Sequence, residues 1–197
     1  MTEIVLVLFA YLLGSVSFGY IVGRLSGKDV RKTGSGNIGA TNVMRAAGKA
    51  AGLVTLILDV AKGYVPVLLV ENYSDPNGTL PLLCGGAALL GHCFPIFLKF
   101  RGGKGVATAL GVFMRLSPLY ILFGLGAFIV VLAVTRFVSV GSIVAVLTMP
   151  IALWIGGEPG SMVLFALAVA ILIIAKHRKN IARLLRGEEN KLGSKGG

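Results

Sequence analysis

Long apolar runs alternate along the chain with short polar, glycine-rich or basic segments. A bilayer core about 30 Å thick takes about 20 apolar residues in a helix, so each run was compared with that length. The runs without Asp, Glu, Lys or Arg are Ile4–Gly23, Pro76–Leu98, Leu116–Thr135, Phe137–Gly157 and Pro159–Ala175. Gly52–Val70 would join them but for Asp59 and Lys62. The pattern predicts an all-α integral membrane protein with at least six spans.

Composition leads to the same class. Hydrophobic residues make up 55% of the chain and charged residues 14%, with a mean hydropathy of +0.86, which excludes an ordinary water-soluble domain. Glu3 precedes the first apolar run and Arg24 follows it, opposite to a secretory signal peptide, so a retained helix is predicted. Cys84 and Cys93 share one apolar run without metal-ligand spacing and are interpreted as packing residues.

Basic residues are concentrated in alternate connections, which predicts orientation through the positive-inside rule. The basic connections hold Arg24, Lys28, Arg31, Lys32, Arg45 and Lys49, then Lys99, Arg101 and Lys104, then Arg136, and finally seven bases from Lys176 to Lys195. The opposite connections hold Glu3, Glu71, Asp75 and Glu158, with Arg115 as their only base. The N-terminus is therefore predicted outside and the C-terminus in the cytoplasm. Topology accounts for the net charge of +11, and nucleic-acid binding is not predicted.

One crossing must be unusually short. Arg136 and the basic tail can lie on the same side of the membrane as Lys104 only if the chain crosses the membrane twice between Lys104 and Arg136. Besides Leu116–Thr135, only Gly105–Met114 is available for this extra crossing. At 1.5 Å per residue this segment covers only about 15 Å. A re-entrant hairpin would leave the basic tail outside, so we predict seven helices, the fourth unusually short. Backbone at that depth must be buried in protein or line a wet cavity, which predicts a polar pocket near the cytoplasmic face.

The segment "FRGGKGVATALG", Phe100–Gly111, has the ingredients of a phosphate site. Gly102, Gly103 and Gly105 let the backbone approach a ligand, and the following helix directs its N–H groups and positive dipole end to the same place as Lys104. The segment departs from the P-loop pattern, which argues against nucleotide hydrolysis. The alternative is a flexible loop with a snorkelling lysine.

The segment "TGSGNIGATNVMRAAGK", residues 33–49, combines hydrogen-bonding groups, glycines and a guanidinium. The hydrogen-bonding residues are Ser35, Asn37, Thr41 and Asn42, and the glycines that would bring backbone close are Gly34, Gly36 and Gly39. Arg45 can bind an anion through two parallel hydrogen bonds. The alternative is a solvated connection, which the length of the segment and its lack of acids disfavour.

The tail "KHRKNIARLLRGEENKLG", residues 176–193, has apolar residues at helical spacing among bases, which predicts an amphipathic helix on an anionic membrane surface. His177 and Asn180 share a face of this helix. The histidine could donate a hydrogen bond or shuttle a proton, or could be an ordinary interfacial residue. Ser139 and Ser142 lie at the start of a span, where a hydroxyl can cap a helix or bind a ligand oxygen.

Two ionisable residues interrupt the second apolar run. Asp59 and Lys62 are one helical turn apart and either neutralise each other or serve function, as intramembrane charges usually do. His92 in the third run is interpreted as hydrogen-bonded within the bundle.

These segments resemble the PlsY-type family of bacterial membrane acyltransferases. The resemblance rests on "SGNIGATNVMRAAGK", "GHCFPIFLKFRGGKGVATALG", "RFVSVGSI" and "HRKN" followed by Gly187 and Glu188, in this order. It implies one membrane-embedded domain over residues 1–197, in the bacterial cytoplasmic (inner) membrane, with an active site facing the cytoplasm. The implied reaction moves a fatty acyl group from acyl phosphate to the 1-hydroxyl of glycerol 3-phosphate. Its products are lysophosphatidic acid and inorganic phosphate, in the first acylation of phospholipid synthesis.

The resemblance and the motifs together give a set of site residues. The predicted catalytic residues are Ser35, Arg45, Lys104, His177 and Asn180. The predicted substrate-binding residues are Gly36, Asn37, Gly39, Thr41, Asn42, Gly102, Gly103, Gly105, Ser142 and Glu188. Our hypothesis places the acyl phosphate on Lys104, the glycine-rich backbone and Ser35, and glycerol 3-phosphate on Arg45, Ser142, His177 and Asn180. Either the leaving phosphate or His177 accepts the hydroxyl proton. The expected partners are these substrates and membrane lipid, with no metal, cofactor or obligate protein partner.

Two other functions were weighed. A transporter of a phosphorylated solute would suit an anion pocket, but transporters often have inverted repeats and a midplane site, whereas here the polar motifs gather on one side. A lipid phosphotransferase would require an Asp cluster for metal, and the predicted cytoplasmic acids are only Asp29, Glu188 and Glu189. The His-x₄-Asp pair of soluble-type glycerolipid acyltransferases is also absent, because Phe97 and Ala182 stand at the fifth position after the two histidines.

Overall fold

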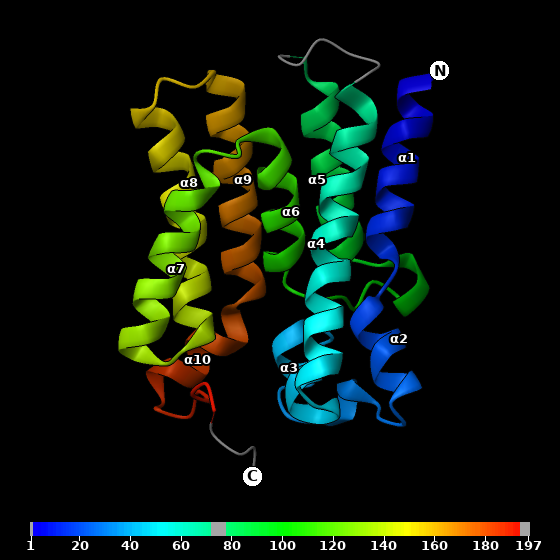
Figure 1. Ribbon diagram of the computed structural model, residues 1–197, viewed down its shortest axis with the longest axis vertical. Helices are drawn as coiled ribbons and strands as arrows, with labels where there is room; N and C mark the ends of the chain where they lie inside the picture. The colour runs from blue at the N-terminus through cyan, green and yellow to red at the C-terminus, as the bar shows by residue number, and fades with distance from the viewer. Residues whose placement is uncertain (1, 72–77, 194–197) are drawn as a thin grey trace. The chain divides into compact units, whose positions relative to one another are not determined.

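The computed structural model describes residues 2–71 and 78–193, and within them every regular element is a helix. The chain divides into two compact units, which are described separately: unit 1 within Met1–Leu116 and unit 2 within Ser117–Ser194 (Figure 1). The prediction of an all-α protein is confirmed.

Unit 1 is built from long helices with a polar, irregular segment at one end. Its elements are α1 (Thr2–Ser15), α2 (Phe18–Leu25), η1 (Val30–Lys32), α3 (Ala40–Ala47), α4 (Lys49–Glu71), α5 (Leu80–Cys93), η2 (Ile96–Leu98) and α6 (Val106–Leu116). Helix α1 packs on α5, and α4 packs on α3, α5 and α6. Glycines permit close approach, since a Cβ on Gly14 would collide with Ala88 and a Cβ on Gly63 with Thr108. Small residues therefore bring these helix backbones together.

Unit 2 is a helical hairpin extended by two further helices. Its elements are α7 (Ile121–Thr135), α8 (Val138–Ile155), α9 (Gly160–Lys176) and α10 (Arg178–Leu185). Helix α8 packs between α7 and α9, and α10 leaves α9 at an angle of 56°. The predicted amphipathic helix in the tail is thus present as α10.

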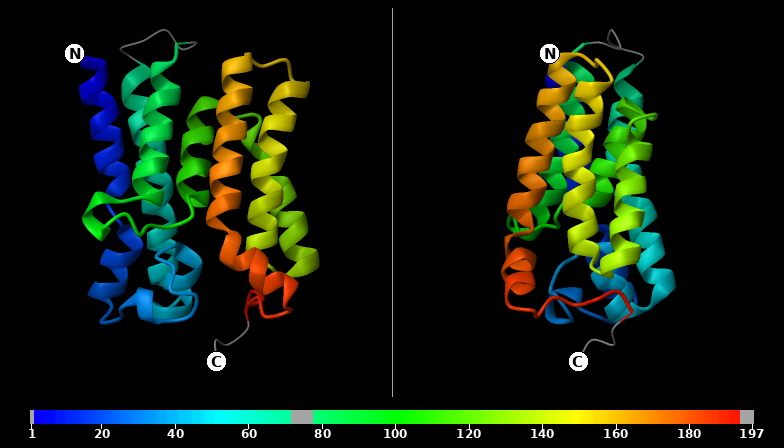
Figure 2. Two further views of the ribbon diagram at one scale, coloured as in Figure 1. Left: turned by 180° about the vertical axis from the view of Figure 1, so that it is seen from behind. Right: turned by 90° about the vertical axis from the view of Figure 1, so that its left-hand side faces the viewer.

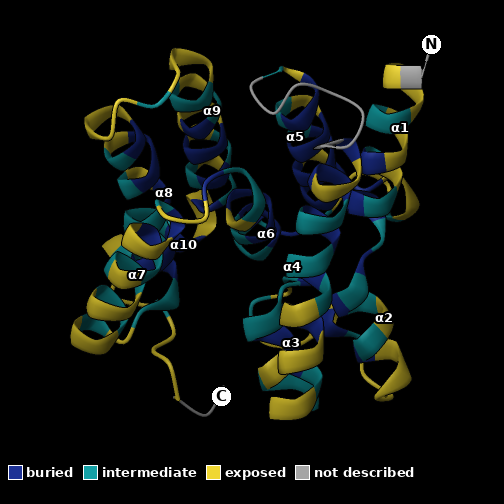
Figure 3. Ribbon diagram, turned by 45° about the horizontal axis from the view of Figure 1, so that its top comes forward, coloured by how far each residue is buried: buried dark blue, intermediate teal, exposed yellow. Residues whose placement is uncertain are grey.

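The helices of both units have exposed residues along their outer faces (Figure 3), and many of these residues are large and hydrophobic. Val134 of α7 is 80% exposed and Trp154 of α8 is 73% exposed. Among the described residues, four spans are long and apolar enough to cross a membrane: Glu3–Leu25, Lys49–Val70, Leu80–Leu98 and Val138–Ile155. The bent pair α9 and α10 raises this number to five when taken as one span, and α6 and α7 are shorter apolar helices. Such surfaces are stable against lipid and not against water.

The boundaries differ from the predicted runs in informative places. The first run is two helices, because the chain leaves helical geometry at Val16 and Ser17. The third run ends as a helix at Cys93 before Pro95, and its predicted first residues, 76 and 77, lie outside the described residues, as do Asp75 and Lys195. A short apolar helix, α6, is observed where the short fourth crossing was predicted. Helix α3 was missed, because it lies in a segment whose glycines indicated irregular structure.

Candidate active site

In unit 1, the side chain of Asn42 organises the polar segment between α2 and α3. Its Nδ2 donates to the carbonyl oxygens of Val30 at 2.8 Å, Thr33 at 3.0 Å and Asn37 at 2.8 Å, while its Oδ1 accepts from the Ser35 N–H at 2.9 Å. The residue is only 2% exposed. Asn42 was predicted to contact phosphate, but its amide is engaged by the backbone of its own loop. Its observed role is to fix the loop that carries Ser35.

The glycines of this segment allow its backbone to turn. Gly34 and Gly36 have φ values of +58° and +69°, in the left-handed region where side chains are strained. A Cβ on Gly34 would also lie 2.5 Å from Asn42 Oδ1. Gly39 precedes α3 as its N-cap in extended geometry. The sequence predicted that these glycines bring the backbone close to a ligand. The structure shows in addition that Gly34 and Gly36 are required by their left-handed backbone conformation.

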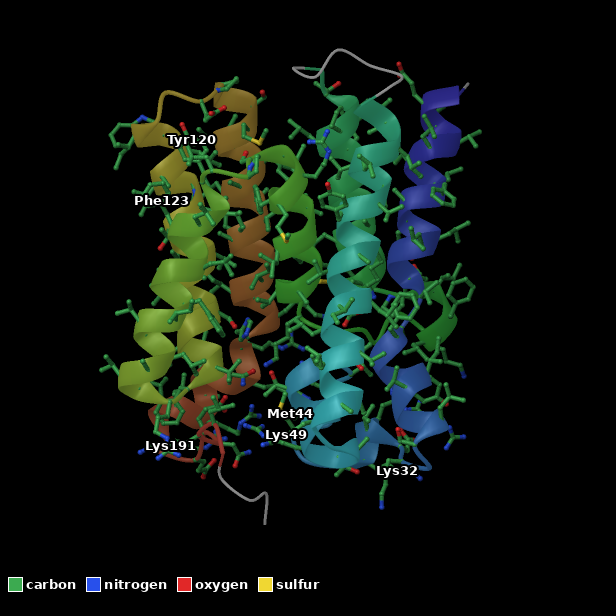
Figure 4. All side chains as sticks on the ribbon, viewed as in Figure 1. Lys32, Met44, Lys49, Tyr120, Phe123 and Lys191 are labelled. Carbon is green, nitrogen blue, oxygen red and sulfur yellow. The ribbon has the colours of Figure 1, made fainter. Side chains whose placement is uncertain are left out.

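Helix α3 carries Thr41 in its first turn and Arg45 in its last turn, both half-buried. On the other side of the segment, Arg31 pairs with Asp29 through Nε and Nη2 at 2.9 and 2.8 Å. Its guanidinium also lies 4.4 Å from the centre of the Tyr20 ring. The Arg31 hydrogen bonds hold the pKa of Asp29 well below its ordinary value. Figure 4 shows Lys32 and Lys49 at the end of unit 1 that carries α2 and α3.

The second loop of unit 1 joins η2 to α6 and contains Lys104. The Gly103 N–H donates to the His92 carbonyl oxygen at 3.1 Å, and a Cβ on Gly103 would collide with the His92 ring. A Cβ on Gly102 would collide with the His92 backbone. Gly105 has φ +90°, and α6 begins at the next residue, Val106. The loop is therefore pressed against the end of α5, and its lysine stands just before a helix N-terminus, as the sequence predicted.

The two loops of unit 1 share a hydrophobic contact. A buried hydrophobic cluster in the segment between α2 and α4 consists of Val30, Ile38 and Val43. Leu98 of η2 packs against this cluster. Figure 2 shows the connection between α5 and α6 crossing at the level of the break between α1 and α2. Packing within unit 1 thus positions the Lys104 loop relative to the Ser35 loop.

In unit 2, Glu189 is the centre of a network that sequence reasoning missed. Its carboxylate accepts from Ser139 Oγ at 2.8 Å, Asn180 Nδ2 at 2.6 Å and Arg183 Nε at 2.7 Å. Burial raises the pKa of Glu189, but the hydrogen bonds from Asn180, Ser139 and Arg183 outweigh it and hold the pKa below its ordinary value. The network ties the starts of α8 and α10 to the tail, which also contains Lys191 (Figure 4).

The other predicted residues of unit 2 are placed as follows. Glu188, predicted to bind substrate, is exposed and pairs with Arg186 Nε at 2.7 Å. Ser142 Oγ donates to the Val138 carbonyl oxygen at 2.8 Å. His177 is 1% exposed, and its Nδ1 lies 2.8 Å from the Ile173 carbonyl oxygen. Because that oxygen can only accept, Nδ1 carries a proton, and in the neutral ring the lone pair is on Nε2.

Replacement of Glu189 with Gln is expected to destabilise the protein at neutral pH, by roughly 1–3 kcal/mol, because the amide loses the charge paired with Arg183. A carboxyl whose folded-state pKa is depressed stabilises the fold above its unfolded pKa, and this stabilisation disappears as pH falls through the folded pKa. The Tm difference between wild type and Glu189→Gln in detergent should therefore be largest at neutral pH and shrink in acid. The control, Glu188→Gln, alters an exposed pair and should leave Tm nearly unchanged at every pH. An equal Tm for wild type and Glu189→Gln at neutral pH would contradict the network's role.

Within the described residues, no group of three His, Cys, Asp or Glu side chains is arranged to hold a metal ion. The chemistry available in unit 1 is that of a lysine, an arginine, hydroxyls and backbone N–H groups. The chemistry available in unit 2 is that of serine hydroxyls, His177 and the Asn180 amide. Such groups bind anions and stabilise developing negative charge.

The helical fold and the apolar exterior define an integral membrane protein, and its two glycine-rich loops carry groups of the kind that bind anions. The model of the family described as glycerol-3-phosphate acyltransferase matches residues 4–187. The chain therefore belongs to this family, and to its PlsY type.

Curated relatives match almost the entire chain. A glycerol-3-phosphate acyltransferase of Geobacter sulfurreducens is 47% identical over 193 residues, covering 97% of this chain and 98% of its own. One from Aquifex aeolicus is 42% identical over 191 residues, covering 97% and 100%. Full-length similarity of this kind includes both units.

Two crystal structures of PlsY, an integral membrane glycerol 3-phosphate acyltransferase, share the fold. The glycerol 3-phosphate form is 42% identical, with a TM-score of 0.95 over 98% of this chain and 96% of that one. The lysophosphatidic acid form is 41% identical, with a TM-score of 0.92 over 100% and 98%.

Proposed function

We propose that this protein transfers a fatty acyl group from acyl phosphate to the 1-hydroxyl of glycerol 3-phosphate. The products are lysophosphatidic acid and inorganic phosphate. The names of the relatives and of the two crystal forms support the acceptor and the product. The observation that carries most weight is the glycine-rich loop, which contacts His92 and places Lys104 two residues before the start of α6.

Unit 1 supplies groups for a phosphate. Lys104 contributes a charge, the backbone of Gly102, Gly103 and Gly105 comes close without side chains, and the α6 N-terminus adds its dipole. Arg45 and Ser35 are carried by the loop that Asn42 organises. An acyl phosphate is a reactive mixed anhydride, so positioning and charge stabilisation can supply much of the rate acceleration.

Unit 2 carries hydrogen-bonding groups of its own. Asn180 is oriented by Glu189, and Ser142 lies in the first turns of α8. His177 stands at the bend between α9 and α10, where its Nδ1 is held by the Ile173 carbonyl. These residues can hydrogen-bond to the hydroxyl and phosphate oxygens of glycerol 3-phosphate.

The hydroxyl proton passes to the leaving phosphate, which departs from the carbonyl carbon under attack. His177→Gln should then lower kcat by less than about 100-fold, because Gln preserves a hydrogen-bonding group near Nε2, whereas loss of a general base costs about 10²–10⁴-fold. Steady-state kinetics of folded protein measure this. A loss beyond about 10³-fold with unchanged KM for glycerol 3-phosphate would assign the proton to His177.

The protein is further proposed to lie in the bacterial inner membrane as seven spans, with α6 as the short fourth span and α7 as the fifth. The Lys104 loop and helix α10, which contains Asn180, then face the cytoplasm, where the basic residues gather. Single cysteines introduced at Lys32 and Gly157 into a variant lacking Cys84 and Cys93 test the orientation. A membrane-impermeant thiol reagent applied to intact cells should label position 157 and not position 32, and the reverse pattern would overturn this topology.

The reaction itself is tested with purified protein in lipid vesicles that receive acyl phosphate and glycerol 3-phosphate. Lysophosphatidic acid acylated at the 1-position is the expected product, identified by mass spectrometry. Absence of product from folded protein would overturn the proposal.

A further inference from the structure

A buried cluster of ionisable residues lies between α4 and α5 in unit 1, apart from the predicted site residues. Asp59 and Lys62 come from α4 and His92 from α5, and none is more than 4% exposed. Lys62 Nζ is 2.8 Å from Asp59 Oδ1, and His92 Nδ1 is 3.7 Å from the same oxygen. The lysine is also 5.6 Å from the centre of the Phe18 ring.

Stability alone does not account for this cluster. Burial removes water from the charges, and a buried ion pair is often no more stabilising than apolar residues of the same volume. In a segment apolar enough to span a membrane the desolvation penalty is at its largest, so retained charges indicate a specific use. The residues that the cluster contacts indicate what these charges do.

His92 contacts the Lys104 loop. The His92 ring has its Nδ1 toward Asp59, while its opposite edge, at Nε2, fills the space that a Cβ on Gly103 would occupy. The His92 carbonyl oxygen accepts from the Gly103 N–H. The carboxylate therefore lies beside one edge of the ring, and the other edge of the ring and the His92 backbone contact the residue before Lys104.

Lys62 contacts the break between α1 and α2. Lys62 Nζ donates to the Val16 carbonyl oxygen at 2.8 Å, in the break itself. Helix α2, which starts two residues later, packs against the Ser35 loop, because a Cβ on Gly19 would collide with Ile38. The same cluster thus holds elements that support both polar loops of unit 1.

We propose that Asp59, Lys62 and His92 are positioning residues that hold the Lys104 loop in its anion-binding geometry. They act through the loop backbone and carry no proton for the reaction. The kinetic part of the inference rests on the proposed function, while the position of the loop does not.

His92→Phe tests this step by step. Phenylalanine keeps a ring over Gly103, removes the imidazole contact with Asp59 and leaves the Asp59–Lys62 ion pair in place. We expect His92→Phe to lower kcat/KM about 10- to 100-fold in protein that remains folded. When the same change is made in the Lys104→Gln variant, kcat/KM should fall less than about 3-fold further, because the effects of substitutions within one network are not additive. Thr55→Val, a buried change on α4 whose hydroxyl donates to the Ala51 carbonyl oxygen of the same helix at 2.8 Å, is the control and should retain activity. Independent, multiplicative losses would overturn the proposal.

Hydrogen exchange provides a readout without substrates. Backbone amides of residues 101–105 should exchange faster in His92→Phe than in wild type and Thr55→Val, because the Gly103 N–H is held less firmly. Unchanged protection there would overturn the positioning role whatever the acyl donor proves to be. If His92→Phe does not fold, Asp59→Asn combined with Lys62→Met removes both charges together, and faster exchange at residues 101–105 is again required.

Discussion

Lys104→Gln should lower kcat/KM by about 100-fold or more, because removal of one preorganised charge-stabilising donor typically costs about 10²–10³-fold. Glutamine retains a polar side chain of moderate length but no charge next to the α6 N-terminus. Purified variants assayed for lysophosphatidic acid formation measure the effect.

Lys99→Gln is the matched control, since Lys99 belongs to the same connection but is exposed. It should retain activity within about 3-fold, as surface charges are worth little. Full activity in Lys104→Gln would remove the phosphate role of this loop while leaving the family assignment intact.

Gly102→Ala should cause a loss of similar size, about 100-fold in kcat/KM, for a steric reason. A Cβ at this position would collide with the His92 carbonyl oxygen and would lie 2.8 Å from the Cys93 carbonyl carbon. Backbone atoms of a packed helix end cannot move aside as a flexible side chain can, so the loop itself must shift. The KM for each substrate, determined separately, shows which phosphate depends on the loop.

Gly126→Ala in α7 is the control, because among the described residues no atom beyond its chain neighbours and the nearby backbone of its own helix lies within 4 Å of its Cβ position. It should have wild-type activity and a similar Tm. A Gly102→Ala protein that folds and works normally would show that the glycine is not required by the geometry described here.

Charge placement predicted more of this fold than helix periodicity did. The short helix α6 followed from the need to bring Arg136 and the basic tail back to the side of Lys104, and the helix is present at Val106–Leu116. The number of spans remains a prediction.

Tertiary contacts explain what sequence could not predict. Nothing in "GSVSF" marks the break after Ser15, which is supported by Lys62 from a distant helix. Helix α3 is short and follows a glycine-rich loop, so its local pattern was weak. Adjacent glutamates gave no means to distinguish exposed Glu188 from Glu189, which turns toward Ser139 and Asn180. Asn42 was recognised as important for its polarity, but only the fold shows that its partners are backbone groups.

The most direct test is to measure phosphate release and lysophosphatidic acid formation together. Wild-type protein in lipid vesicles receives labelled glycerol 3-phosphate with either acyl phosphate or acyl-CoA. With acyl phosphate, one phosphate should appear for each lysophosphatidic acid formed, and acyl-CoA should give no product. Product from acyl-CoA alone, or phosphate release without acylated glycerol 3-phosphate, would contradict an acyl-phosphate-dependent glycerol-3-phosphate acyltransferase.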